Sequence, residues 1–336
     1  MYVRNNLRGH IIWKFSWKNV LAFTTYSSLI CLLYVVFDWR GISIPWQPIA
    51  TLGIAVSFYI GFKNNGSYDR FSEARQLWGG IVNYSRTWSI QALEYVTSVV
   101  DGPGVSAPAA SRAELSLRHR RLVYRQIAWC NALRLHLRRQ ADQWDQQVGV
   151  FLDPAESVEM QRKQNPAVHL LRQQAADLRV LREERGLLND FQHINMMTSI
   201  EQFNVLQGGC ERIKNTPFPR QYAFFSFVFV WIFAALLPLG LLEEFEKLGP
   251  GRVWLTIPFS VLISWIFTTI EVVGHTSENP FENEINDVPM TALCRTIEID
   301  LREMLGDRGI RVNCVVPGPV WTPNIPCTIP ASEVEI

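Results

Sequence analysis

The chain has 336 residues, of which 48% are hydrophobic and 19% are charged, and its formal net charge is +1. This near-neutral charge excludes a strongly basic nucleic-acid-binding protein, so no nucleic-acid partner is expected. The average conceals a division, because four stretches contain no Asp, Glu, Lys or Arg: 21–37, 41–62, 221–242 and 253–270. A simple cytosolic enzyme and a disordered chain are therefore excluded. Membrane-spanning helices and helices buried in a soluble core remain as alternatives.

We predict an all-α membrane protein with four transmembrane helices, two within 21–62 and two within 221–272, because about 20 apolar residues cross a bilayer core. The cytoplasmic N-terminus, 1–20, contains basic residues and no acid, and basic residues near a first span stay inside. Both termini are then cytoplasmic. The intervening region 63–220, with 21 Lys and Arg against 16 Asp and Glu (a net +5), is also inside.

The second span lies in a predicted pore-lining helix at about 46–66, and Ile54, Phe58 and Phe62 share one of its faces. Periodicity alone allows this face to meet lipid, a neighbouring helix or a water path. Polar residues continue the face in both directions and favour a water path; the pore-lining candidates are Gln47, Thr51, Gly66, Asp69 and Glu73. Adjacent residues differ by about 100° around a helix, so the sequence leaves open whether Asp69, which favours cations, or Arg70, which favours anions, points inward.

Region 63–220 is predicted to be a helical cytoplasmic domain. Helical patterns cover 69–99, 112–148, 166–185 and 188–214, and a loop rich in Gly, Pro, Ser and Ala lies at 101–111. The region shows no strand pattern, no glycine-rich phosphate loop and no paired cysteines, so we expect no cofactor and no structural zinc site. The Arg-rich stretch Arg112–Arg139 fits either a surface that binds lipid headgroups or an anion, or a solvated helix face with ion pairs.

Three clusters of residues follow one another along residues 1–305. The first is Gly61, Phe62, Lys63, Asn64 and Asn65, then Tyr68, Arg70, Glu73, Ala74, Arg75, Leu77, Trp78 and Gly79. The second is Gly209, Cys210, Glu211, Arg212 and Ile213, then Thr216, Pro217 and Pro219. The third is Glu278, Asn279, Pro280 and Phe281, then Asn286, Asp287, Val288 and Pro289, and later Ile297, Glu298, Ile299 and Asp300. Together they resemble the bestrophin family of ion channels, in its bacterial branch.

The resemblance implies a barrel-shaped homopentamer in the bacterial inner membrane, whose partners are copies of itself, membrane lipids and monovalent ions. It implies that Ile54, Phe58 and Phe62 form the hydrophobic neck of the pore, and such apolar constrictions gate by dewetting. It also matches Ile194 to a second constriction, the cytoplasmic aperture, although the residue alone favours an ordinary core position. The resemblance implies chloride and related anions from the animal branch, with monovalent cations as the alternative for the bacterial branch, so the ion is left open.

After the last span, in the cytoplasmic C-terminal segment 273–305, the animal branch of the family carries an acidic run that binds calcium. The matching side chains here are Glu282, Glu284 and Asp287, and Asn283, Ile285 and Asn286 interrupt them. Calcium prefers six to eight oxygen ligands, several of them charged, and Ile285 supplies no side-chain oxygen. We therefore predict a degenerate clasp, no metal site and currents that calcium does not change.

The tail 306–336 differs in character from the rest. Within it, 306–328 resembles a strand and Pro-Gly turn of short-chain dehydrogenases, which suggests an oxidoreductase as one alternative. The chain has no GxxxGxG turn after a strand and no Tyr-x-x-x-Lys pair, and a dinucleotide without the phosphate turn has no cradle. We therefore predict a passive ion channel and no enzyme. A non-conducting membrane scaffold that uses the Arg-rich helices is the other alternative.

Overall fold

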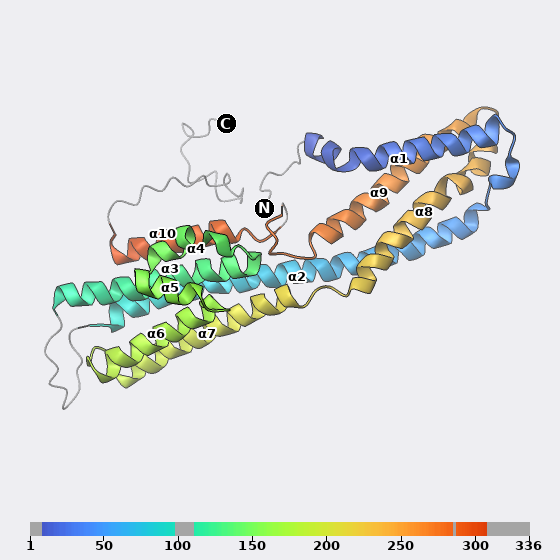
Figure 1. Cartoon of the computed structure of the whole chain (residues 1–336). Helices are drawn as coiled ribbons and strands as arrows, with labels where there is room; N and C mark the ends of the chain where they lie inside the picture. Colours follow the sequence, from blue (N-terminus) through green and yellow to red (C-terminus); the bar gives the residue numbers. More distant parts are fainter. Residues whose placement is uncertain (1–8, 98–110, 285–286, 308–336) are drawn as a thin grey trace, which may run out of the picture.

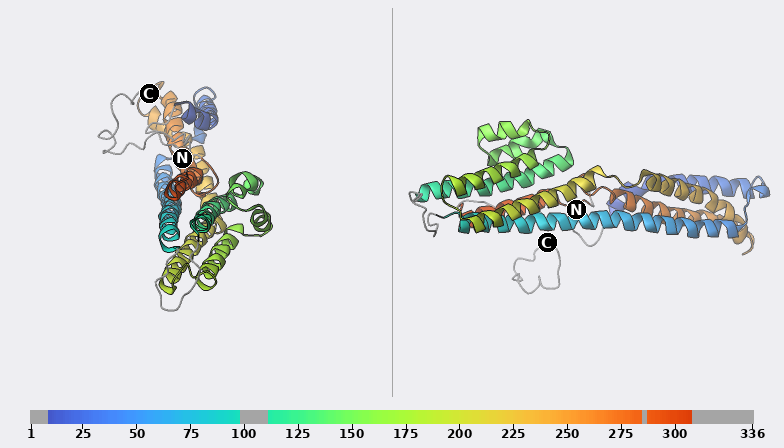
Figure 2. Two further views of the ribbon diagram at one scale, coloured as in Figure 1. Left: turned by 90° about the vertical axis from the view of Figure 1, so that its left-hand side faces the viewer. Right: turned by 90° about the horizontal axis from the view of Figure 1, so that it is seen from below.

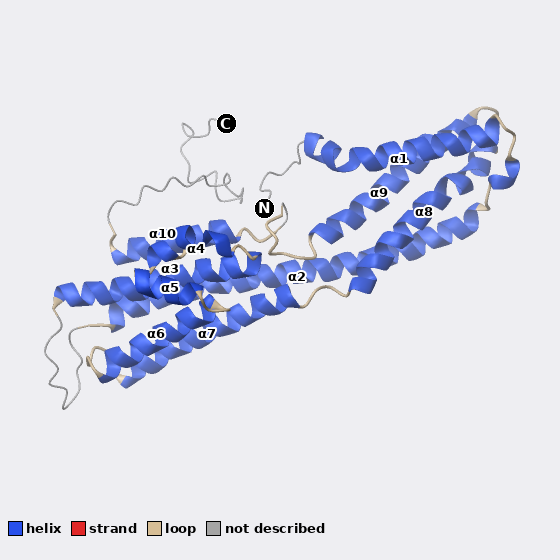
Figure 3. Ribbon diagram, in the orientation of Figure 1, coloured by secondary structure: helices blue, strands red, loops and turns tan. Residues whose placement is uncertain are grey.

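The computed structural model describes residues 9–97, 111–284 and 287–307, with side chains from Ser16 onward. Within these ranges the chain is helical and contains no strand (Figure 3). The helices lie roughly lengthwise and give an elongated molecule (Figure 1). In chain order the longer helices are α1 (Gly9–Val35), α2 (Trp46–Tyr95), α3 (Arg112–Arg138), α5 (Pro154–Gln161), α6 (Pro166–Glu183), α7 (Asp190–Asn215), α8 (Arg220–Glu246), α9 (Thr256–Thr276) and α10 (Met290–Leu305). Short helical turns connect some of them: η1 (Arg40–Ile42), η2 (Ala141–Gln143), α4 (Trp144–Gln147), η3 (Gly149–Phe151) and η4 (Arg252–Leu255).

One end of the molecule is built from α1, α8, α9 and the first half of α2 (Figures 1 and 2). The described residues contain four helical stretches that are long and apolar enough to cross a membrane: 16–35, 40–95, 220–246 and 252–276. Helix α9 packs against α8 and α1, and α2 packs against α8. The predicted all-α class with four membrane helices is confirmed.

Helix α2 joins the two ends of the molecule. It runs for 50 residues, about 75 Å at 1.5 Å per residue, and continues well past residue 66. Its proline, Pro48, lies in the first turn, where a missing N–H does not interrupt the helical ladder. The membrane end and the remaining helical body are therefore connected by one uninterrupted helix, next to which α7 packs in the body.

The core of the body lies where α2, α3 and α7 meet. The rings of Trp129 and Phe203 lie 4.8 Å apart between centroids, and Trp88 approaches Phe203 edge-on at 6.1 Å. Both indoles also donate hydrogen bonds, Trp88 to the Leu122 carbonyl at 3.3 Å and Trp129 to the Gln207 side chain at 3.1 Å. These bonds satisfy the polar atoms of two fully buried rings, as burial requires.

Helix α3 is shorter than its sequence pattern predicts. The expected helix to Val148 is wrong, because Arg139 adopts a left-handed conformation with φ of 56° and its N–H closes the helix onto the His136 and Leu135 carbonyls. The chain then continues in the short turns η2, α4 and η3. No Gly or Pro marks this break, and the short turns preserve the helical spacing of apolar residues beyond it.

Candidate ion pathway

The apolar face of α2 is exposed in the single subunit. Ile54, Phe58 and Phe62 have exposed fractions of 60%, 67% and 72%, and they line a groove of about 510 Å³. Ser57, Gly61 and Asn65 complete the wall of this groove. The opposite face of α2 is buried: Ile49, Val56 and Ile60 pack with Val230, Phe233 and Leu237 of α8. The three predicted neck residues are thus brought together on a face that the subunit itself does not cover.

At the outer end of this face, Gln47 and Thr51 are both exposed. The Thr51 hydroxyl donates to the Gln47 carbonyl at 3.0 Å, so its hydrogen is used within the helix. The oxygen keeps lone pairs for water. The outer candidates therefore provide a polar continuation of the groove.

At the inner end the structure separates the candidates. Asp69 is exposed, but Gly66 is not in the groove, since a Cβ there would meet the Phe218 ring at 2.9 Å. Asn65 occupies the groove instead. Glu73 is partly exposed and forms an ion pair with Arg212 of α7. Of these three inner candidates, Asp69 alone presents an exposed carboxylate without an ion pair among the described residues.

Arg70 points into the subunit and away from the groove. Its guanidinium donates to the backbone carbonyls of Ile213, Thr216 and Glu278, at 2.9, 2.9 and 3.0 Å. Arg70 ties α2 to the end of α7 and to the segment after α9, whereas Asp69 is exposed on the single subunit.

Directly after Phe62, a buried ion pair joins α2 to α9. Lys63 of α2, with no exposed side-chain surface, donates to Glu271 of α9 at 2.8 Å. Beside it, the Asn64 amide donates to the Ile270 carbonyl at 3.2 Å. A Cβ at Gly274 would lie 1.8 Å from the Asn64 side-chain oxygen, so glycine is required for this close approach of α2 and α9. The position of Phe62 is therefore fixed from behind.

Ile194 lies on an exposed face of α7, where it is 62% exposed and lines a shallow depression with His193, Met197 and Val205. This exposure does not fit an ordinary core position. Phe191, one turn earlier, is 84% exposed and was missed by the sequence analysis. Phe191 is the second residue of α7, beside the capping box of Asn189 and Gln192, and a large aromatic residue within that capping motif was the available signal. Burial, and to a smaller extent the positive charge of Arg182, lowers the pKa of His193 below its ordinary value.

Comparison with known proteins decides the family. The sequence profile described as Bacterial/Fungal Bestrophin protein matches residues 3–303. The chain belongs to the bestrophin family. This bestrophin is 30% identical over 302 residues to the voltage-dependent anion channel-forming protein YneE of Salmonella typhi, with 90% of each chain covered. It is also 30% identical over 299 residues to the protein of the same name in Escherichia coli K12, with 88% of each covered.

Solved structures agree with this assignment. A crystal structure of a bacterial bestrophin homologue from Klebsiella pneumoniae superimposes with a TM-score of 0.75 at 28% identity. The match covers 86% of this chain and 98% of that one. The predicted family resemblance over residues 1–305 is confirmed. The short dehydrogenase resemblance covers 306–328, and from residue 308 onward this stretch lies outside the described residues.

In this bestrophin the stretch that matches the calcium clasp is engaged with its own protein. Glu282 pairs with Lys214 at 2.7 Å, and the Asp287 carboxylate accepts the Glu284 backbone N–H at 3.1 Å. Asp287 is almost fully buried, and desolvation raises its pKa while hydrogen bonds from the backbone oppose this. Residues 285 and 286 lie outside the described residues. The described part of the chain holds no group of three or more His, Cys, Asp or Glu side chains placed to bind a metal.

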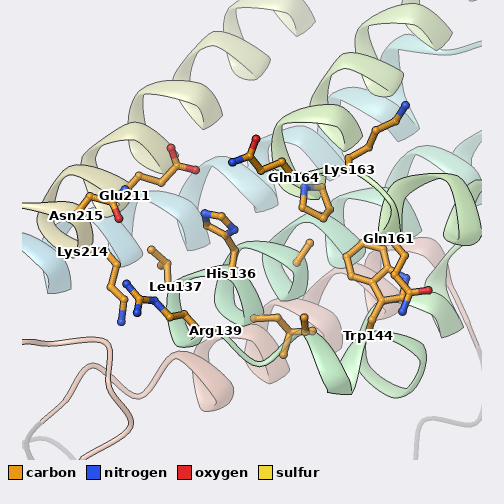
Figure 4. A pocket seen from close by; sticks show the side chains of 14 residues that line it. His136, Leu137, Arg139, Trp144, Gln161, Lys163, Gln164, Glu211, Lys214 and Asn215 are labelled. Carbon is orange, nitrogen blue, oxygen red and sulfur yellow. The ribbon is translucent and has the colours of Figure 1, made fainter.

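A cavity of about 370 Å³ lies between the ends of α3 and α7 and the connection from α5 to α6 (Figure 4). The two lysines that line it pair with acids outside the cavity. Lys214 pairs with Glu282 at 2.7 Å and Lys163 with Glu159 at 3.5 Å. The Glu211 carboxylate accepts hydrogen bonds from Asn165 at 2.8 Å and Gln207 at 2.7 Å. Glu211 belongs to the second sequence cluster of the resemblance, and these bonds give it a structural role, joining α7 to the start of α6.

Proposed function

We propose that this bestrophin assembles as a homopentamer around the exposed face of α2 and conducts anions passively through a neck of Ile54, Phe58 and Phe62. The observation that carries the proposal is this uncovered apolar stripe, which is bounded by polar residues at both ends. A symmetric ring places the same surface of every copy on its axis. Five copies of the stripe would form a narrow apolar collar, and an apolar collar conducts only when it is wet.

The anion assignment is supported by the relatives, which are named voltage-dependent anion channel-forming proteins. A collar built from Phe58 and Phe62 would be compatible with anions, because the edge of an aromatic ring carries partial positive charge. A second constriction at Ile194 and Phe191 would follow along the same path. We place the protein in the bacterial inner membrane with both termini cytoplasmic, on the strength of the basic N-terminus and the +5 charge of region 63–220.

The test is recording from purified protein in planar bilayers with asymmetric NaCl. A reversal potential toward the chloride equilibrium value supports the anion channel, a value toward sodium contradicts the anion assignment, and absence of current supports a non-conducting scaffold. Phe58→Ala should widen the collar and raise conductance. The matched control is Phe224→Ala on α8, a phenylalanine of similar exposure (61%) outside the groove, which should leave conductance unchanged. Equal effects of the two variants would remove Phe58 from the neck.

A further inference from the structure

A cavity of about 550 Å³ opens between α3, η3 and α5, within the volume range of small-molecule sites. Four arginines of α3 line it: Arg118, Arg120, Arg121 and Arg125. Two acids, Asp153 and Glu156, also line it, so the basic side chains outnumber the acidic ones. We call it the arginine cavity. Neither α2 nor α7 contributes a lining residue, and the cavity is therefore separate from the candidate ion pathway.

Arg125 belongs to the framework of the arginine cavity. Its side chain is 1% exposed and binds both oxygens of Glu156, at 2.5 and 3.1 Å. It also donates to Asp177 of α6 at 2.6 Å and to Gln174 at 3.3 Å. These bonds use the guanidinium donors on both sides of the planar group. Arg125 thereby holds α3, α5 and α6 together and forms the floor of the cavity.

The other three arginines keep unused donors. The nearest acid to Arg118 is Glu114 at 3.9 Å, and the Arg118 Nε–H is buried without a hydrogen-bond partner among the described residues. Arg121 meets Asp177 at 3.3 Å and Glu156 only at 3.9 Å. Arg120 is exposed and lies over the Tyr124 ring, 4.9 Å from its centroid. Each guanidinium offers five N–H donors in a planar fork that matches phosphate or carboxylate oxygens.

The remaining wall of the arginine cavity is apolar and aromatic. The rings of Tyr124 and Phe151 meet edge to face with centroids 6.0 Å apart. Leu117 and Val150, which also line the cavity, are exposed large apolar side chains. A ligand that fits this wall carries an apolar or aromatic group beside its anionic group.

The position of the cavity along the molecule excludes a membrane lipid as the occupant. The hydrogen bond from Trp88 to the Leu122 carbonyl places this part of α3 level with Trp88 on α2. Trp88 follows Gly66, near the inner end of the membrane helices, by 22 residues of continuous helix, or about 33 Å. A headgroup at the bilayer surface does not reach that far, so the ligand must be soluble.

We propose that the arginine cavity binds a soluble phosphate monoester whose organic group is aromatic or apolar. Arg118, Arg120 and Arg121 would hold the phosphate oxygens, and Tyr124 with Phe151 would contact the organic group. A phosphate dianion is attracted to the three arginines more strongly than a single carboxylate is, and this attraction outweighs its repulsion by Asp153. Arg125 would be a positioning residue that keeps the wall in place.

The test uses the detergent-purified full-length channel and phenyl phosphate as the probe, measured by isothermal titration calorimetry. Saturable binding is expected for the wild type. R118Q/R120Q should weaken it by at least about tenfold, because charge-assisted hydrogen bonds are lost. The matched control is R112Q, an exposed arginine at the start of the same helix outside the cavity, which should bind like the wild type. Melting temperatures without probe confirm that the variants are folded.

Further probes separate the parts of the proposal. Inorganic phosphate should bind more weakly than phenyl phosphate, and phenol should not bind. Vesicles of anionic lipid added to the detergent-solubilised protein should not displace the probe. Absence of saturable binding, equal binding by R118Q/R120Q, equal affinity for inorganic phosphate, or displacement by lipid would each overturn the assignment. Because binding is measured directly, the result is independent of whether the protein conducts.

Discussion

The buried pair of Lys63 and Glu271 gives the sharpest prediction, because it joins α2, the proposed pore-lining helix, to α9 directly behind Phe62. The substitution Lys63→Met keeps most of the side-chain volume and removes the charge. It leaves the Glu271 carboxylate, only 9% exposed, without its partner. Ionisable residues in membrane helices are costly unless they are paired in this way.

The magnitude follows from the balance of attraction and desolvation. At the 2.8 Å separation, the Coulomb attraction is about 6 kcal/mol at an effective dielectric constant of 20. Desolvation of two ions costs several kcal/mol each and offsets most of this, so the pair contributes little net stability relative to an apolar pair. Breaking one side is different: it leaves an uncompensated buried charge, which costs about 3–5 kcal/mol. Lys63→Met should therefore be strongly destabilising, and Lys63→Met/Glu271→Leu should recover most of the loss.

The assay is thermal unfolding and oligomer retention in detergent. It is applied to Lys63→Met, Glu271→Leu and the double variant, and the results are analysed as a double-mutant cycle. Lys247→Met is the matched control, since its pair with Glu244 at 2.7 Å has nearly the same distance but is exposed on both sides. It should change stability little, because exposed ion pairs are screened by water. A double variant as unstable as Lys63→Met, or a single variant as stable as the wild type, would refute the reasoning.

Three further predictions concern the inner half of the molecule. Gly274→Ala should destabilise the protein by about 1–3 kcal/mol in thermal unfolding, because the new Cβ would lie 1.8 Å from the Asn64 oxygen. The pKa of His193 is lowered by burial and by Arg182, so this side chain takes up its proton at a pH below the ordinary histidine range. Chloride current in bilayers should rise as the pH falls through that range, at some cost in stability, and His193→Gln should abolish the rise. Calcium added to the bath should leave the current unchanged, since the buried Asp287 is occupied by backbone donors; opening by calcium would contradict the degenerate clasp.

The sequence predicts the membrane architecture well because its physical cause is local. Four uncharged stretches satisfy the bilayer length, and a four-residue repeat selects one face of α2. The structure finds Ile54, Phe58 and Phe62 together on that face. The distribution of charge and the helical period are both properties of short windows, so they need no knowledge of distant partners.

The inner end of the pathway could not be predicted in the same way. Arg70 turns away from the groove because its hydrogen-bond acceptors are the carbonyls of Ile213, Thr216 and Glu278, more than 140 residues away in sequence. Gly66 is covered by Phe218 for the same kind of reason. A helical wheel ranks neighbouring positions by angle alone, and long-range contacts of this kind decide between positions about 100° apart.

The orientation of Asp69 also bears on how an anion could be selected. Because Arg70 is turned away, the exposed charge about two helical turns after Phe62 is the Asp69 carboxylate, which repels anions. In a wide, water-filled vestibule this repulsion is screened within about 8–10 Å. Inside a narrow apolar collar the dielectric is low, and the ring edges of Phe58 and Phe62 act at short range with little screening. In the proposed assembly, selection for anions would therefore arise at the collar or at the constriction near Ile194, and the Asp69 carboxylate would limit its extent.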